Sequence, residues 1–200
     1  MDIDEHYINK QFDMIVATDL NWGIGINNGL LALVKQDMEF FKARTMNHVV
    51  IMGRKTAESL PHGYLNGRIN VILSHSFGDN VDVSHIDEST TIIKINGINK
   101  LLRYISLNYP TKKPYVVIGG RSIYVEFLQR ELIDRIFLTT YFKKFKNVDT
   151  YIPDLSTLGF KHDLTNPNHV ITGYELPQKA IVGKSPINMK FTIHTLTLTK

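Results

Sequence analysis

One carboxylate near the start of the chain stands between a glycine-rich loop and a run of large apolar side chains. It is Asp37, within the segment WGIGINNGLLALVKQDMEFFK at residues 22–42. Val34, Met38 and Phe41 recur at the i, i+4 and i+7 positions of an amphipathic helix, which places Asp37 at the border of the apolar stripe. Partial desolvation there is expected to raise its pKa, which suits a group that holds a proton for, or hydrogen-bonds, a polar heterocycle. The alternative is an exposed first-turn aspartate stabilised by the helix dipole.

Glycine separates a predicted strand from a predicted helix at two further places. Gly53 precedes Arg54-Lys55-Thr56, and Gly119-Gly120 precedes Arg121-Ser122. The free N–H groups of a helix N-terminus, with basic or hydroxyl side chains beside them, bind phosphate. Two such places in one sheet suggest a ligand with phosphates at separate points, which fits a dinucleotide. The full GxGxxG spacing is absent, so a structural turn or a solvated helix start is the alternative for each.

Three other positions carry groups with binding or catalytic chemistry. Arg68 opens a strand after the loop PHGYLNG, where an exposed arginine is the alternative. Ser74-His75 ends a strand with no helix after it. Tyr124 lies in an apolar helical stripe, and the alternative for it is a core side chain.

The composition limits the class of protein. The 200 residues are 43% hydrophobic and 21% charged, which is typical of one globular domain with a core. With no cysteine and no HExxH cluster, neither a disulfide framework nor a metal site is expected. The net charge of +4 is scattered apart from the short run at 143–146, which predicts a solvated loop better than a nucleic-acid patch. No transmembrane span or signal peptide is predicted, so a cytoplasmic protein is expected.

Strands and helices alternate along the chain. Asn96 is the expected N-cap of one helix, and residues 154–190, rich in Gly, Pro and Asn, are the least informative stretch. The alternation predicts an α/β fold whose parallel central strands are covered by helices on both faces, with an antiparallel C-terminal edge. Strands are expected at 13–18, 48–53, 68–74, 90–95, 114–118, 135–142 and 191–198, and helices from Val34 onward and after Gly53, Asn96 and Gly120.

The order IVATDLNWGIG, KQDMEFFK, VVIMGRKTAESL, GRINVILS, VVIGGRSIY and IFLTTY resembles dihydrofolate reductase from about residue 13 to the C-terminus. The resemblance implies a three-layer α/β fold with a central mixed, mostly parallel, eight-stranded sheet and helices on both faces. It implies a single domain at 13–200 after an N-terminal extension at 1–12. It also implies reduction of 7,8-dihydrofolate to 5,6,7,8-tetrahydrofolate with NADPH as hydride donor, in support of one-carbon metabolism and thymidylate synthesis. Functional coupling to thymidylate synthase is left open.

The matching motif positions also imply roles for individual residues. Asp37 is similar to the acidic residue that holds the pterin 2-amino and N3 edge, with Thr139 bonded behind it and Tyr124 as a further catalytic and substrate-binding group. The Gly119-Gly120 peptide is cis in the family. The other substrate-side residues implied are Ile15, Val16, Met38, Phe41, Arg68 and Ile118. The cofactor-side residues implied are Ala17, Ile24, Gly25, Gly53, Arg54, Lys55, Thr56, Leu73, Ser74, His75, Gly119, Gly120, Arg121, Ser122 and Ile123.

The chain departs from the family pattern after the glycine loop. Where the family has Leu-Pro-Trp followed closely by Pro, this chain has Leu30-Leu31-Ala32 and Leu33-Val34-Lys35. Without proline or the indole, a loop that is costly to close and a slow or weakly binding enzyme are expected. Two rivals stay open: a pyrimidine reductase of riboflavin synthesis with the same fold, and a catalytically weakened NADPH- or folate-binding module that acts as a partner or regulator.

Overall fold

The computed structural model describes residues 12–111, 114–162, 178–182 and 185–198. The chain divides into two compact units. The first comprises Met1–Asp13 with Thr45–Ile133, and the second comprises Met14–Arg44 with Asp134–Lys200. The expected N-terminal extension falls almost wholly outside the described residues, and Phe12 already opens the first strand. Within the described part of the chain, no helix is both long and apolar enough to cross a membrane.

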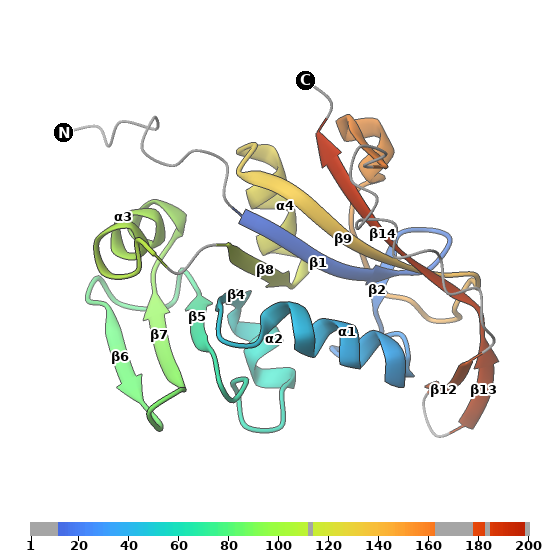
Figure 1. The fold of residues 1–200 in the computed structure, drawn as a ribbon, viewed down its shortest axis with the longest axis horizontal. Coiled ribbons are helices and arrows are strands. Elements are labelled where there is room, and N and C mark those ends of the chain that lie inside the picture. The colour runs from blue at the N-terminus through green and yellow to red at the C-terminus, as the bar shows by residue number, and fades with distance from the viewer. Residues whose placement is uncertain (1–11, 112–113, 163–177, 183–184, 199–200) are drawn as a thin grey trace. The chain divides into compact units, whose positions relative to one another are not determined.

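The first unit is built on parallel strands that are apolar throughout. β4 (Val49–Gly53) pairs in parallel with β5 (Ile69–Leu73) and β8 (Tyr115–Gly119), and β5 pairs in parallel with β7 (Thr91–Ile95). All five residues of β4 are buried, as expected for a strand covered on both faces. β6 (Asp82–His85) adds an antiparallel edge strand to β7 (Figure 1).

Three helices connect these strands. α2 (Arg54–Ser59) follows β4, α3 (Ile98–Asn108) follows β7, and α4 (Arg121–Gln129) follows β8. α3 buries Ile98, Leu101 and Ile105, so its predicted apolar stripe is confirmed. The expected cap is wrong: the N-cap is Gly97 at φ 86°, not Asn96, because the chain turns there through a conformation that glycine adopts without strain.

The second unit contains four further strands of the large sheet. These are β1 (Phe12–Thr18), β9 (Ile133–Tyr141), β11 (Phe160–His162) and β14 (Phe191–Leu198), in the order β11-β14-β9-β1. β14 runs antiparallel to both β9 and β11, which confirms the antiparallel C-terminal edge. A short 3₁₀ helix, η2 (Leu155–Leu158), precedes β11.

The fold class is confirmed as α/β with a large mixed, mostly parallel sheet. The strand count differs from expectation, because nine strands of the described residues form this sheet where the resemblance implied eight. β6 lies in the polar stretch that sequence patterning left without a strand. All four of its residues are exposed, so it carries no buried apolar face from which a strand could be recognised.

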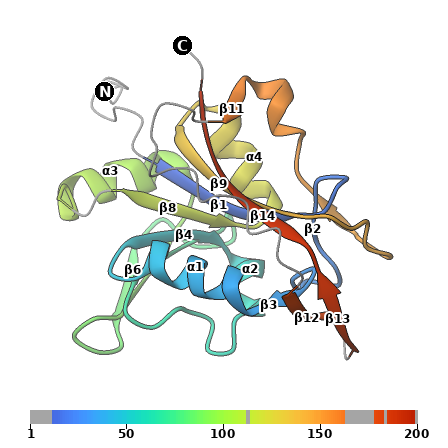
Figure 2. The same cartoon turned by 45° about the vertical axis from the view of Figure 1, so that its right-hand side comes forward.

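Two small antiparallel sheets order the segment around the glycine loop. β2 (Gly23–Gly25) pairs with β10 (Thr150–Tyr151). β3 (Leu33–Val34) pairs with β12 (Gln178–Val182), which forms a hairpin with β13 (Ser185–Met189), as Figure 2 shows. Val34 therefore belongs to a strand, and α1 (Lys35–Thr45) begins one residue later than the expected stripe. The hairpin lies in the stretch from which the sequence predicted no element.

At Ala32, where the chain departs from the family pattern, buried side chains of the second unit pack together. Leu31, Ala32 and Val34 are at most 5% exposed and share one buried cluster with Tyr141 and Phe191. Buried side chains and the pairing of β3 hold residues 31–34 at this end of the loop. The expected cost of loop closure stays a prediction.

We predict that Ala32→Trp lowers the free energy of unfolding by about 1 to 3 kcal/mol, because an indole at this filled position forces its neighbours apart. Urea denaturation measures the change. Ala43→Trp, at an exposed position of α1, is the matched control and is expected to change stability by less than about 0.5 kcal/mol. Equal stability of Ala32→Trp and the parent would show that position 32 has room for an indole.

Candidate active site

Asp37 is held by two hydroxyl groups from one strand of the second unit. The side chain of Thr139 donates from Oγ1 to Asp37 Oδ1 at 2.6 Å, and Tyr141 donates from Oη to Asp37 Oδ2 at 2.7 Å. Thr139 and Tyr141 stand two residues apart on β9, so their side chains leave the same face of the strand. Asp37 lies in the first turn of α1, as the alternative interpretation required, but its carboxylate is engaged in side-chain bonds.

Burial sets the protonation of this group. Loss of solvent raises the pKa of Asp37 above its ordinary value of 3.8, while the hydrogen bonds from Thr139 and Tyr141 act in the opposite direction. Burial and the neighbouring carboxylate together raise the pKa of Tyr141 well above 10.0. The tyrosine hydroxyl is therefore a neutral donor to the carboxylate at neutral pH.

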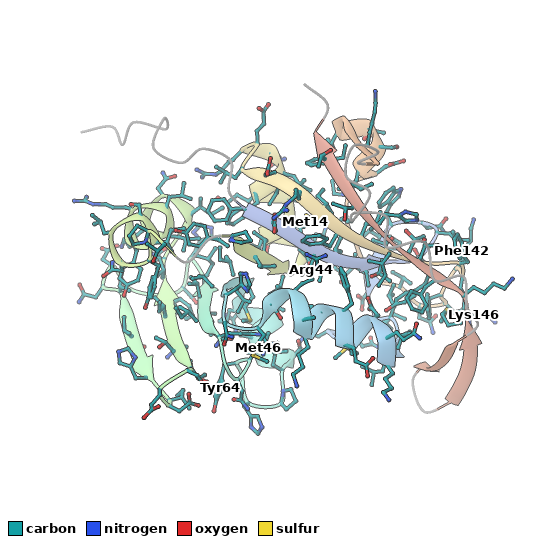
Figure 3. The ribbon with its side chains drawn as sticks, in the orientation of Figure 1. Met14, Arg44, Met46, Tyr64, Phe142 and Lys146 are labelled. Carbon is teal, nitrogen blue, oxygen red and sulfur yellow. The ribbon has the colours of Figure 1, made fainter. Side chains whose placement is uncertain are left out.

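An aromatic and cationic stack lies further along α1. The Phe40 and Phe137 rings meet edge to face with centroids 5.9 Å apart. The guanidinium of Arg44, labelled in Figure 3, lies 4.6 Å from the Phe137 ring centroid and 5.4 Å from that of Phe40. Such contacts stabilise a cation over aromatic faces and fix the orientation of α1 on β9.

The apolar residues expected on the substrate side differ in burial. Ile15 and Val16 of β1 are buried, and Phe41 is half-buried. Met38 is 44% exposed, because α1 turns Asp37 and Phe40 toward the packed side of the second unit instead. Its role as an apolar wall stays a prediction.

Glycines let two strand ends of the first unit approach closely. Met52 of β4 is in register with Gly119 of β8, and the Gly119-Gly120 peptide is cis. A Cβ on Gly53 would lie 3.1 Å from Ile123 Cγ1, and a Cβ on Gly120 would lie 3.0 Å from Thr56 Oγ1. The segments that begin α2 and α4 are thus in mutual contact, and side chains on these glycines would push them apart.

Both helix starts leave backbone donors without a side-chain cap. The N-caps of α2 and α4 are Gly53 and Gly120, and neither makes a side-chain cap hydrogen bond. Arg121 and Ser122 are exposed in the first turn of α4. Lys55 is exposed at the start of α2. Uncapped first-turn N–H groups near basic and hydroxyl side chains are what a phosphate requires.

Arg54 has a partner that sequence patterning did not anticipate. Its guanidinium pairs with the Glu58 carboxylate at 2.5 Å, four residues along α2, and both side chains are about half exposed. A cation in the first helical turn is unfavourable for the helix dipole, and this pair offsets part of that cost. An incoming phosphate would share Arg54 with Glu58.

The end of β5 lies beside the end of β4. Leu73 is in register with Gly53, so Ser74 and His75 follow at the same edge of the sheet. The Ser74 hydroxyl is 2.8 Å from that of Ser76, and His75 is exposed. The strand ends at Gly53, Leu73 and Gly119 therefore bring to one edge the three motifs of the first unit that are predicted to bind the cofactor.

Arg68 is buried in the first unit without a carboxylate partner in its two hydrogen bonds. Its Nε donates to Thr45 Oγ1 at 3.0 Å, and its Nη1 donates to the Asn66 carbonyl at 2.5 Å. Burial lowers the pKa of this guanidinium. The alternative of an exposed arginine is wrong, because Arg68 is 5% exposed. A buried cation bonded to neutral groups is suited to an anionic ligand.

Five remaining predicted residues lie in less informative surroundings. Tyr124 is buried, and its ring atoms stand 3.0 Å from where a Cβ on Gly119 would be. Burial raises the pKa of its hydroxyl. Ile118 is half-buried on β8, and Ala17 and Ile24 are half-buried in the second unit. Gly25 pairs with Thr150 in the small sheet of β2 and β10.

Sequence reasoning missed Tyr141 and Thr45. The signal for Tyr141 was available, because a polar residue two positions after Thr139 shares its face of the strand. Thr45 carried no such signal, since its bond to Arg68 joins residues 23 positions apart.

The fold and these residues define an α/β protein with glycine-lined strand ends in one unit and a hydroxyl-held carboxylate in the other. The dihydrofolate reductase family model matches residues 11–171, and the chain belongs to that family. The family uses NADPH and binds dihydrofolate.

Individual relatives agree with this membership. A dihydrofolate reductase from Heliothis virescens is 30% identical over 183 residues, which cover 86% of this chain and 91% of that protein. Dihydrofolate reductase type 9 from Escherichia coli is 34% identical over 129 residues, 64% of this chain and 68% of that protein. A bifunctional dihydrofolate reductase-thymidylate synthase from Arabidopsis thaliana is 31% identical over 75% of this chain and 27% of its own length.

We predict that Asp37→Asn changes how stability depends on pH. The pKa of Asp37 is raised in the folded protein, so the folded state binds this proton more tightly than the unfolded chain does. Relative to the variant, the parent should lose free energy of unfolding as the pH rises from about 3.8 through the raised pKa of Asp37. The loss is about 1.4 kcal/mol or less for each unit by which folding raises that pKa. Urea denaturation at a series of pH values measures the difference.

The control for this comparison is Asp134→Asn, at an exposed position of β9. Its stability should follow that of the parent as the pH rises above 3.8. A constant difference between the parent and Asp37→Asn over this range would contradict the raised pKa.

Proposed function

We propose that this protein catalyses the NADPH-dependent reduction of 7,8-dihydrofolate to 5,6,7,8-tetrahydrofolate. The observation that carries the proposal is the Asp37 carboxylate, held by Thr139 and Tyr141 on the side of α1 that packs within the second unit. Membership of the dihydrofolate reductase family supports it.

The carboxylate has the acceptor capacity that the pterin requires. Two oxygens offer about four lone-pair directions, and the two hydroxyls use two of them. The remaining directions can accept from the 2-amino group and N3 of the pterin, a two-pronged arrangement that sets the orientation of the ring. Ile15 and Ile118 are the proposed backbone-carbonyl partners on the other side of the heterocycle.

Arg68 is the proposed partner of the folate α-carboxylate. Its bonds to Thr45 and Asn66 hold the guanidinium in place without neutralising its charge. Charge-assisted bonds of this kind contribute about 1.5 to 3 kcal/mol each.

The first unit fits the phosphates of NADPH. Gly53, Gly119 and Gly120 allow close backbone approach, and the uncapped starts of α2 and α4 offer N–H donors. NADPH, when bound, supplies the hydride that reduces the C6–N5 imine of the pterin. The chain's own contribution is to orient both ligands and to keep a carboxylate at the pterin edge, while N5 is protonated from water.

The two rivals differ from this proposal in testable ways. A pyrimidine reductase of riboflavin synthesis would need neither the Asp37 constellation nor a buried Arg68, so these residues favour dihydrofolate. A weakened binding module would bind NADPH or folate without turnover. Loss of NADPH absorbance on addition of dihydrofolate, with a folate-analogue inhibitor as control, separates the proposed reaction from both rivals.

We predict that Asp37→Asn keeps the fold and NADPH binding but lowers kcat/KM for dihydrofolate by about a hundredfold or more at neutral pH. The amide removes the negative charge and one hydrogen-bond acceptor from the pterin edge. Removing one partner of a buried, charged hydrogen-bonded pair costs several kcal/mol. Steady-state kinetics from pH 5 to 9 give the comparison, and Asp134→Asn should match the parent. Near-parent activity of Asp37→Asn across this range would remove Asp37 from the mechanism.

We predict that Arg54→Ala weakens NADPH about tenfold or more and weakens NADH far less. Arg54 is the proposed contact of the 2′-phosphate, which NADH lacks, and the loss of a charge-assisted bond accounts for the difference. Fluorescence titration measures both dissociation constants.

Arg130→Ala is the matched control, because Arg130 also forms a pair at four-residue spacing, with Glu126 at 3.1 Å. It should leave both cofactors unaffected. Equal losses of affinity for NADPH and NADH in Arg54→Ala would indicate that Ser74 and His75, and not Arg54, bind the 2′-phosphate.

A further inference from the structure

Tyr141 combines a buried ring with a hydroxyl that reaches the Asp37 carboxylate. It is 2% exposed and belongs to the buried cluster with Ala32 and Phe191. Its ring meets those of Phe145 and Phe191 edge to face, with centroids 6.1 and 6.3 Å away. Its hydroxyl nevertheless ends on Asp37 Oδ2 at 2.7 Å. The apolar ring is fixed on several sides, so the position of the hydroxyl is fixed with it.

We propose that Tyr141 is a positioning residue that, together with Thr139, fixes the plane of the Asp37 carboxylate and keeps it in the charged form that the pterin edge requires. The inference rests on the proposed function. Thr139 holds Oδ1 and Tyr141 holds Oδ2, so rotation of the carboxylate would break both bonds. A carboxylate held by both oxygens meets a two-pronged donor without first losing side-chain freedom.

The small side chain at position 32 is part of this arrangement. Ala32 and Tyr141 share one cluster, in which Leu31, Val34 and Phe191 are also buried. A bulky group at 32 would compete with the tyrosine ring for the same packed volume. The departure from the family pattern at Ala32 therefore coincides with a phenol that reaches the carboxylate directly.

Other charged groups lie on α1 and on the elements around it. Lys35 and Glu39 are exposed on α1 and pair with each other at 3.8 Å. The hydroxyl of Tyr141 is the titratable group that bonds Asp37 within the part of the chain that the structure describes. Other charged or titratable groups nearby are Lys42 and Arg44 on α1, Asp134 and Arg135 on β9, His194 on β14, and Lys143 over the Phe145 ring. The buried carboxylate of Asp19 accepts from the Phe145 backbone N–H at 3.2 Å.

The test is Tyr141→Phe, which removes the hydroxyl and leaves the ring. A donor to the carboxylate favours its charged form, so the pKa of Asp37 should rise by about one to two units in the variant. Carbon-13 NMR of aspartate-labelled protein measures this titration without substrate, and Asp37→Asn assigns the signal. The acid limb of the kcat/KM profile should move upward by the same amount.

Kinetics add a second readout. Because Tyr141 acts on binding geometry, KM for dihydrofolate should rise about tenfold at neutral pH while kcat changes less. Tyr115→Phe is the matched control: Tyr115 is 3% exposed, and its hydroxyl donates to the Tyr109 carbonyl at 2.8 Å. It should leave the Asp37 titration and the KM unchanged.

An Asp37 titration that is identical in the parent and Tyr141→Phe would overturn the inference. Absence of dihydrofolate turnover in the parent would instead sink the proposed function, and the NMR titration would still decide the role of Tyr141. If Tyr141→Phe does not fold, 3-fluorotyrosine at position 141 gives the reverse test. Its more acidic hydroxyl should lower the pKa of Asp37, and an unchanged titration in that protein overturns the inference as well.

Discussion

The interaction on which the second unit depends is the hydroxyl-held carboxylate of Asp37. Burial of a carboxylate is unfavourable unless its oxygens are hydrogen-bonded, and here one strand supplies both donors. The two-residue period of β9 brings Thr139 and Tyr141 to one face, and the first turn of α1 brings the acid to them. The Phe40, Phe137 and Arg44 stack fixes the same helix against the same strand one to two turns further on. The raised pKa of Asp37 follows from this packing.

In the first unit the governing constraint is backbone proximity. Parallel pairing sets Gly53 beside Leu73 and Met52 beside Gly119, so three loops leave one edge of the sheet together. Glycine is required at Gly119, where φ is 112° and a Cβ would meet the Tyr124 ring. The helices that follow leave their first N–H groups without side-chain caps. These N–H groups are the donors that we propose for the phosphates of the cofactor.

The segment after the glycine loop shows how packing replaces a missing motif. Neither proline nor tryptophan stiffens residues 30–35, yet Leu31 and Val34 are buried and β3 is paired with β12. Buried apolar area and strand hydrogen bonds limit the conformations of this segment in place of proline. The same cluster holds the Tyr141 ring, so core packing and the geometry of the carboxylate are linked through one side chain.

The sequence by itself determined the α/β class, the main parallel strands, the helices after Gly53 and Gly120, and Asp37 as the carboxylate of interest. These follow from local apolar runs and glycine positions, which act over a few residues. Tertiary structure alone decided the partners of Asp37 and Arg68, since Tyr141 lies 104 positions from Asp37 and Thr45 lies 23 from Arg68. It also decided the exposed strand β6, the β12–β13 hairpin beside β3, and the exposure of Met38. Local patterns carry no information on such contacts, because each depends on which distant segment packs against the residue.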